Sequence, residues 1–292
     1  MLKRLSFLCA SLLVLAACSN NNDSANTAPQ PTPASTAAPA AQPSAASTAS
    51  APAAAASTAP ATPAPASSSQ QAAAPTPAPA APATPFVDNG KWVEGKHYVR
   101  LEPAQSKVSN TDKIEVVEVF SYGCPACNQF HPTMNKLAQE LPANAVVAYL
   151  PASFMPQENW PMLQRAFLTA QALGVADQAN DAMYDAVWKT QELTAMKGAG
   201  LKPVSALPTL EDASKVYAKF GANPQEFLAV ANSFAINTKV KRSDDLLKAY
   251  GVEETPTIVV DGKYRLTPRS AGGNEQAVEL TKWLVSKEAA GN

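Results

Sequence analysis

The stretch from Ile114 to Cys127, IEVVEVFSYGCPAC, decides the fold. Its first seven residues, which end at Phe120, are mostly β-branched and are apolar at both odd and even positions, and this predicts a buried strand covered on both faces. Cys124-Pro125-Ala126-Cys127 follows, and apolar residues then recur at helical spacing from Phe130 onward. Because proline suits the first position of a helix, we expect a helix that begins at the cysteines.

The segments around this stretch predict an α/β core with an all-helical insertion. Further strands are predicted at residues 97–101, 145–150, 257–260 and 264–266. A turn at Asp261-Gly262 joins the last two of these strands, and a final helix is expected near residues 275–286. Residues of about 157–233 show helical patterns, with a capping box at Thr209–Asp212, and form the predicted insertion.

The first 18 residues have the pattern of an exported, lipid-anchored protein. A basic start at Lys3-Arg4 is followed by the apolar run 5–17, which is typical of a signal peptide and too short for a stable transmembrane helix. The run ends in Leu15-Ala16-Ala17-Cys18, which resembles the bacterial lipobox. We therefore expect residues 1–17 to be removed and Cys18 to carry lipid, including palmitate. The alternative is an ordinary signal peptide with a chance cysteine.

Residues 19–85 differ from the rest of the chain in composition. They hold 14 of the 26 prolines, a single charged residue (Asp23), no aromatic residue and no aliphatic side chain larger than alanine. Such a segment cannot bury enough apolar surface to offset its ordering entropy. We therefore predict a disordered tether over residues 18–85 and one folded domain over residues 86–292. The formal net charge of −1, without a long basic run, argues against nucleic acid as a partner.

Cys124 and Cys127 are the only thiols left once the signal peptide is removed and Cys18 is lipidated. A disulfide between them closes too small a loop to stabilise a domain of this size, so their role is chemical. At the start of a helix, unpaired backbone N–H groups and the helix dipole favour a thiolate. We therefore predict that Cys124 attacks and that the more buried Cys127 resolves the mixed disulfide.

Two other uses of a cysteine pair lack the necessary residues. A zinc site needs four ligands, and the chain offers no second cysteine pair and only two histidines, His97 and His131. A c-type haem needs a histidine directly after the second cysteine, where the chain has Asn128. We expect no metal and no organic cofactor, and a surface position for His131.

The chain resembles the DsbA family of thioredoxin-fold thiol oxidases over residues 91–288. The similarity rests on Gly95-Lys96-His97-Tyr98, residues 118–127, the helical insertion and Glu254-Thr255-Pro256-Thr257. The resemblance implies a thioredoxin-like fold with an inserted all-helical subdomain. It also implies that Pro256 is cis, faces the cysteines and, with Thr255, offers main-chain groups to a substrate peptide.

Glu118 and Tyr122 are further candidates for the site. Glu118 lies in a strand where carboxylates are rare, and it is similar to the family's buried acid beneath the cysteines, which implies a proton acceptor for Cys127. The alternative is a glutamate that is partly exposed or salt-bridged. Tyr122 is predicted to line an apolar rim that contacts substrate, and Phe154 to pack in the core.

The chain departs from the family at Ala126, where DsbA proteins commonly carry histidine. A histidine offers the thiolate a positive or hydrogen-bonding neighbour, and alanine offers neither. Since less stabilisation of the thiolate makes the disulfide less oxidising, we predict a weaker oxidant than a relative with histidine at this position.

These features predict a periplasmic thiol:disulfide oxidoreductase, anchored by lipid to a bacterial membrane, that introduces disulfide bonds into exported proteins. The expected partners are reduced, unfolded exported proteins and, as the family implies, a DsbB-like quinone-linked membrane oxidase. We expect a monomer. Two alternatives stay open: a disulfide reductase or isomerase using the same site, and a tethered, non-catalytic, chaperone-like binder.

Overall fold

The computed structural model describes residues 86–291. The predicted signal peptide, the predicted lipidation site at Cys18 and the predicted tether of residues 18–85 lie outside the described residues. Among the helices of the described part, none is both long and apolar enough to cross a bilayer.

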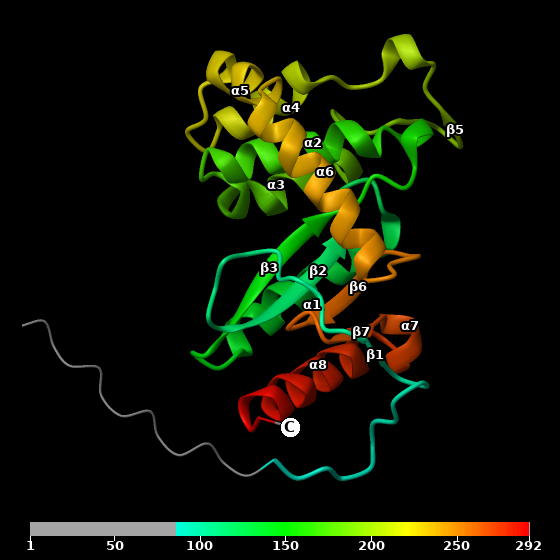
Figure 1. Ribbon diagram of the computed structural model, residues 1–292. Coiled ribbons are helices and arrows are strands. Elements are labelled where there is room, and N and C mark those ends of the chain that lie inside the picture. Colours follow the sequence, from blue (N-terminus) through cyan, green and yellow to red (C-terminus); the bar gives the residue numbers. More distant parts are fainter. Residues whose placement is uncertain (1–85, 292) are drawn as a thin grey trace, which may run out of the picture. The chain divides into compact units, whose positions relative to one another are not determined.

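A five-stranded mixed sheet with the strand order β1-β7-β6-β2-β3 forms the core (Figure 1). β2 (Ile114–Phe120) has the range that the sequence predicts. It is parallel to β3 (Ala145–Pro151) and antiparallel to β6 (Thr257–Val260). β7 (Tyr264–Leu266) and β1 (Val99–Arg100) complete the sheet. Because β2 is paired on both sides and covered on both faces, all its residues after the first are buried.

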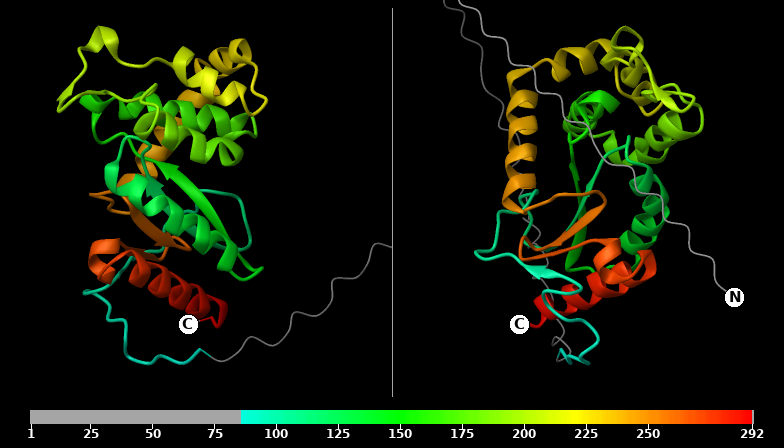
Figure 2. Two further views of the ribbon diagram at one scale, coloured as in Figure 1. Left: turned by 180° about the vertical axis from the view of Figure 1, so that it is seen from behind. Right: turned by 90° about the vertical axis from the view of Figure 1, so that its right-hand side faces the viewer.

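Helices cover both faces of the sheet (Figure 2). α1 (Pro125–Glu140) and α8 (Asn274–Ala289) share one hydrophobic cluster with Val116 of β2. α6 (Phe234–Ala249) lies on the opposite face, where its residues pack against Val117 and Val119. α1 therefore begins close to the end of β2, which is paired with a strand on each side and covered by helices on both faces.

A helical region connects β3 to α6. In chain order its elements are η1 (Pro156–Glu158), α2 (Trp160–Ala172), α3 (Ala176–Trp188), the hairpin strands β4 (Met196–Lys197) and β5 (Gly200–Leu201), η2 (Val204–Ala206), α4 (Leu210–Ala218) and α5 (Pro224–Ala231). The predicted capping box is present at the start of α4, where the Thr209 side chain accepts the N–H of Asp212 and the Asp212 side chain accepts the N–H of Thr209.

Two features differ from the sequence-based expectation. The structure adds α6, which begins directly after its N-cap Ser233, and the short helix α7 (Pro268–Ala271). Phe154 is 37% exposed in the segment between β3 and η1, so the prediction of a core position is wrong. This segment leaves the sheet for the helical region, and neither layer covers the Phe154 ring.

Candidate active site

Cys124 is the N-cap residue of α1. β2 ends at Phe120, and three residues turn the chain into the helix, whose first position is Pro125. The Cys124 sulfur accepts the backbone N–H of Cys127 at 3.2 Å, and the Cys124 carbonyl accepts the N–H of Asn128 at 3.0 Å. The sulfur therefore sits at the positive end of the helix, among donors that have no partner within it.

These contacts make the Cys124 thiol acidic. A hydrogen bond with the Cys127 thiol is the largest cause, and the Thr255 side chain and the backbone N–H groups of Cys127 and Ala126 add to it. Burial opposes these hydrogen bonds, since Cys124 is only 4% exposed. The net effect lowers the pKa of Cys124 from 9.0 to about 6. At neutral pH a free Cys124 is therefore mostly thiolate.

Cys127 lies one turn deeper and has the opposite character. It is fully buried, and burial is the largest of the causes that raise the pKa of its thiol well above the ordinary value. Its hydrogen bond with Cys124 and the negative charges of Cys124 and Glu118 add to the shift. Cys127 therefore holds its proton at neutral pH and needs a base before it can attack.

Two glutamates on β2 show how unusual the environment of Glu118 is. Glu115 and Glu118 are both fully buried. The Glu115 carboxylate accepts the backbone N–H groups of Val108 at 2.7 Å and of Ser109 at 2.8 Å. Neither carboxylate oxygen of Glu118 has a hydrogen-bond partner. Burial, and then the charge of Cys124, raise the pKa of Glu118 to about 8. Glu118 thus gains or loses a proton near neutral pH, beside the two thiols.

Pro256 lies beside Cys124, in the loop that connects α6 to β6. The Thr255–Pro256 peptide bond is cis, and the Thr255 carbonyl oxygen lies 3.5 Å from the Cys124 sulfur, close enough to accept its S–H. Because β6 begins at Thr257, the main chain of Thr255 and Pro256 leads into this strand directly beside the Cys124 sulfur. This arrangement leaves backbone groups next to Cys124 where an extended peptide could pair.

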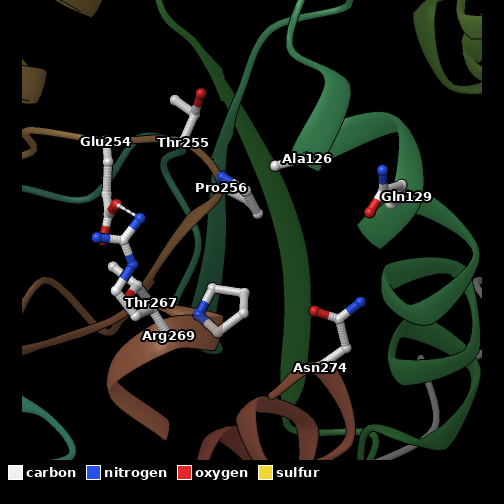
Figure 3. A pocket seen from close by; sticks show the side chains of 9 residues that line it. Ala126, Gln129, Glu254, Thr255, Pro256, Thr267, Arg269 and Asn274 are labelled. Carbon is white, nitrogen blue, oxygen red and sulfur yellow. Dashed lines mark ion pairs between the residues drawn. The ribbon is translucent and has the colours of Figure 1, made fainter. Parts of the chain in front are cut away.

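A groove runs from Pro256 toward α7 and α8 (Figure 3). Gln129 of α1 and Asn274 of α8 extend side-chain amides into it, and Arg269 pairs with Glu254 at its other end, 3.4 Å apart. Sequence reasoning missed Gln129, Arg269 and Asn274 as site residues, because they come from distant parts of the chain and only the tertiary fold brings them together. This side of Cys124 is polar.

Tyr122 does not reach the surface. It is 1% exposed, and its hydroxyl donates to the Asn180 side chain at 2.8 Å within the helical region. Its ring packs edge-on against Phe120 and Tyr184. The prediction that Tyr122 lines a rim in contact with substrate is therefore wrong, because α3 covers the residue.

The predicted surface position of His131 is also wrong. Its ring is buried, stacks on Tyr184 with 4.4 Å between ring centroids, and places Nε2 2.5 Å from the Asp181 carboxylate. His131 and Cys127 are four residues apart on α1 and so share one face of the helix, which could have indicated this burial from the sequence. Within residues 86–291, no group of three or more His, Cys, Asp and Glu side chains is placed to hold a metal ion.

Comparisons with known proteins agree with this geometry. The family model described as "Thioredoxin" matches residues 110–279. The chain is similar to the "Thiol:disulfide interchange protein DsbA" of Pseudomonas aeruginosa, with 36% identity over 199 residues, covering 68% of this chain and 87% of the relative. The protein of the same name from Pseudomonas syringae is 34% identical over 196 residues, covering 67% and 84%.

Solved structures give the same result. The crystal structure of Pseudomonas aeruginosa DsbA matches with a TM-score of 0.59 at 35% identity, covering 70% of this chain and 97% of that one. The oxidoreductase DsbA from Xylella fastidiosa matches with a TM-score of 0.59 at 27% identity, covering 68% and 99%. These matches confirm the predicted thioredoxin-like α/β fold with a helical insertion. The chain therefore belongs to the DsbA family of thioredoxin-fold thiol:disulfide interchange proteins and is an oxidoreductase.

Proposed function

We propose that this protein introduces disulfide bonds into exported polypeptides through a Cys124–Cys127 disulfide. The observation that carries the proposal is the opposite acidity of two thiols one turn apart, with a lowered pKa at Cys124 and a raised pKa at Cys127. A disulfide whose reduced form contains a stabilised thiolate is a strong oxidant, because reduction produces that favourable state.

The reaction begins with a substrate thiolate that attacks the Cys124 sulfur. The Cys124–Cys127 bond breaks, a substrate–Cys124 disulfide forms, and the electron pair leaves on Cys127, whose raised pKa requires a proton. Protonated Glu118 supplies this proton, and its carboxylate takes the proton back when Cys127 attacks in the reverse direction. A second substrate thiolate then attacks the substrate sulfur and releases Cys124 as a thiolate. The substrate is oxidised and the protein is left as a dithiol.

Regeneration of the disulfide requires an electron acceptor. A DsbB-like, quinone-linked membrane oxidase would take the two electrons. Thr255 and Pro256 would hold both this partner and the substrate peptide, since their main chain lies next to Cys124. The site uses no organic cofactor and no metal of its own.

Location follows from the N-terminal sequence. Removal of residues 1–17 and lipidation of Cys18 would anchor a monomeric domain of residues 86–292 in the periplasm through the segment 18–85. Cys18→Ser tests the anchor: the parent should incorporate labelled palmitate and sediment with membranes, and the variant should do neither. A variant that still sediments with label would contradict lipidation at Cys18.

The direction of the reaction is tested by equilibrating the cysteine pair with glutathione and by two activity assays. The full mature chain should oxidise reduced, unfolded ribonuclease, and Cys124→Ser should abolish this activity. Insulin reduction that is fast while ribonuclease oxidation is absent would indicate the reductase or isomerase instead. Full cellular function in the Cys124→Ser strain would indicate a non-catalytic binder.

A further inference from the structure

The two edges of the sheet differ in length. β1, at one edge, has two residues, whereas β3 (Ala145–Pro151), at the other, has seven and is the outermost strand in Figure 1. β3 contains no charged residue, and its only proline is its last residue. Charged side chains and prolines are what commonly keep an edge strand from pairing with another chain. The edge at β3 is therefore long and open to pairing.

The register of β3 against β2 determines which of its backbone groups point outward. The N–H of Ala152, directly after β3, donates to the carbonyl oxygen of Phe120 at 2.7 Å. Because parallel strands bond through alternate residues, the even-numbered residues of β3 bond to β2, and the odd-numbered ones direct their N–H and C=O groups away from it. Val147 and Tyr149 thus present backbone donors and acceptors at the outer edge. No other strand or loop backbone within residues 86–291 pairs with them.

A pocket lies along this edge, between β3, α1 and α3. Its lining comes from four residues of β3, two of α1 and four of α3. It encloses about 950 Å³ of space, part of it open to solvent, which is at the upper end of the range for binding pockets. None of its lining residues belongs to the groove at Pro256. The pocket therefore gives a ligand access to the outer edge of β3 at a place separate from the active-site groove.

The charges beside this edge are negative. Asp177 and Asp181 are exposed, and no other charged residue lines the pocket. Asp181 pairs with the His131 ring, whereas Asp177 has no ion pair within residues 86–291. Burial, and then the charges of Glu118, Asp177 and Asp181, raise the pKa of the Tyr149 hydroxyl, and no positive charge in the described part of the chain opposes them. A ligand at this edge therefore meets a negative electrostatic potential.

We propose that the outer edge of β3 binds an extended segment of another polypeptide as an additional strand, and that this segment carries lysine or arginine beside Asp177. Main-chain hydrogen bonds to Val147 and Tyr149 would provide affinity, and the charge would provide selectivity. The inference goes beyond the proposed function and does not depend on it, since no cysteine takes part.

The chain itself does not supply such a segment. A second copy could pair through its own β3, but β3 has no basic residue, and the pairing would bring Asp177 and Asp181 of both copies to one place. Residues 19–85 contain no lysine or arginine either. The charge at this edge therefore favours a basic segment of a different protein.

The test uses two labelled peptides without cysteine. One is Thr-Lys-Val-Lys-Val-Lys-Thr, and the other has glutamate in place of each lysine. Binding of each peptide to the full mature protein is measured by fluorescence anisotropy. We expect the lysine peptide to bind about tenfold more tightly than the glutamate peptide. Equal affinities, or no binding of the lysine peptide, would overturn the proposal.

Hydrogen exchange identifies the backbone groups that bind the peptide. With the lysine peptide at ten times its Kd, exchange of the Val147 and Tyr149 N–H groups should slow about tenfold. The N–H of Ala148 already bonds to β2 and should not change. Equal slowing at all three positions, or at none, would contradict strand addition. A dimer in sedimentation that protects Val147 without peptide would identify a second copy as the occupant and overturn the proposal.

Two matched charge reversals on α3 locate the selectivity. Asp177 lines the pocket, whereas Asp185, about two turns further along the helix, pairs with Lys189 and does not. Asp177→Lys should weaken binding of the lysine peptide about fivefold, and Asp185→Lys less than twofold. Equal losses would mean that only the overall charge matters and would reject the site. Cys124→Ser should bind the lysine peptide like the parent, so a failed oxidation assay leaves this inference standing.

Discussion

The active site holds the same functional group in two opposite environments. The entrance, defined as Cys124 with Thr255 and Pro256, stabilises a thiolate at Cys124 through hydrogen bonds from the Cys127 thiol, the Thr255 side chain and the backbone N–H groups of Cys127 and Ala126. The floor, defined as Cys127 with Glu118, excludes water and offers the carboxylate no hydrogen-bond partner, so both groups keep their protons. Only two residues, Pro125 and Ala126, separate the two cysteines on the first turn of α1. The two residues are of the same type, so the position of each thiol relative to the helix end and to solvent determines whether it attacks the substrate or resolves the mixed disulfide.

The largest expected effect comes from exchanging the thiols for hydroxyls one at a time. Cys127→Ser should accumulate a substrate–Cys124 disulfide, because loss of the intramolecular attack slows its release by about a hundredfold or more. The Cys124 thiolate attacks a disulfide of an added oxidised substrate and releases one substrate thiolate, and non-reducing electrophoresis measures the resulting mixed disulfide. Cys124→Ser is the matched control and should accumulate none. Equal amounts of mixed disulfide in both variants would contradict the assignment of Cys124 as the attacking thiol and Cys127 as the resolving thiol.

Glu118→Gln should slow the resolution of the mixed disulfide by about a hundredfold, the usual size of a positioned acid–base group. The measurement is single-turnover release of a labelled substrate as a function of pH. In the parent, the rate should depend on ionisation near pH 8, where Glu118 titrates, and this dependence should vanish in the variant. An unchanged rate and pH profile would leave Glu118 without a chemical role.

The same variant should gain stability, which a purely structural residue would not do. A carboxyl whose pKa is raised from 4.5 to about 8 keeps its proton in the folded state and loses it in the unfolded state, so stability falls as pH rises through this range. Between pH 4.5 and pH 7 the loss is on the order of 3 kcal/mol. Urea unfolding of the reduced protein should show a stability advantage of Glu118→Gln over the parent that grows between pH 4.5 and pH 7.

Ala126→His should make the entrance more oxidising. Ala126 is exposed next to Cys124, so a histidine there can place a positive or donor group by the thiolate and stabilise the reduced form. We expect the reduction potential to become more positive by about 30 mV, a tenfold change in the equilibrium constant with glutathione. Ala126→Ser is the neutral control. A reduction potential that stays the same or becomes more negative would contradict the claim that a histidine at position 126 stabilises the Cys124 thiolate.

Tyr122→Phe is expected to have the smallest effect. Loss of the hydrogen bond to Asn180 should lower the free energy of unfolding by about 1 kcal/mol, as for a typical buried hydrogen bond. The kcat/KM for cysteine peptides should not change, because the ring lies in the core. A large loss of peptide turnover without loss of stability would restore a substrate contact at Tyr122.

The sheet and the start of α1 could be predicted because their sequence signals are local. β2 is apolar at successive positions, and Cys124-Pro125 marks the helix start, so neither depends on distant residues. α6 was missed for the opposite reason. Only four of its sixteen residues are buried, and one of these, Ser243, is polar, so few apolar positions mark its buried face.

The site shows the same limit. Sequence spacing places Cys124 and Cys127, and the composition of β2 marks Glu118 as unusual. The misplacement of Tyr122 and His131 has one physical cause, since α3 covers both of them, and that packing is a tertiary contact between segments about fifty residues apart. The polar groove at Pro256 likewise exists only where distant segments meet.

The proposed chemistry depends above all on the acidity of the Cys124 thiol. The reduced mature protein is titrated while the ultraviolet absorbance of the thiolate is followed, with Cys124→Ser as the blank. We expect a transition with its midpoint near pH 6 that is absent from the variant. A midpoint near pH 9, that of an ordinary thiol, would show that the helix start does not stabilise the thiolate and would contradict the proposed chemistry.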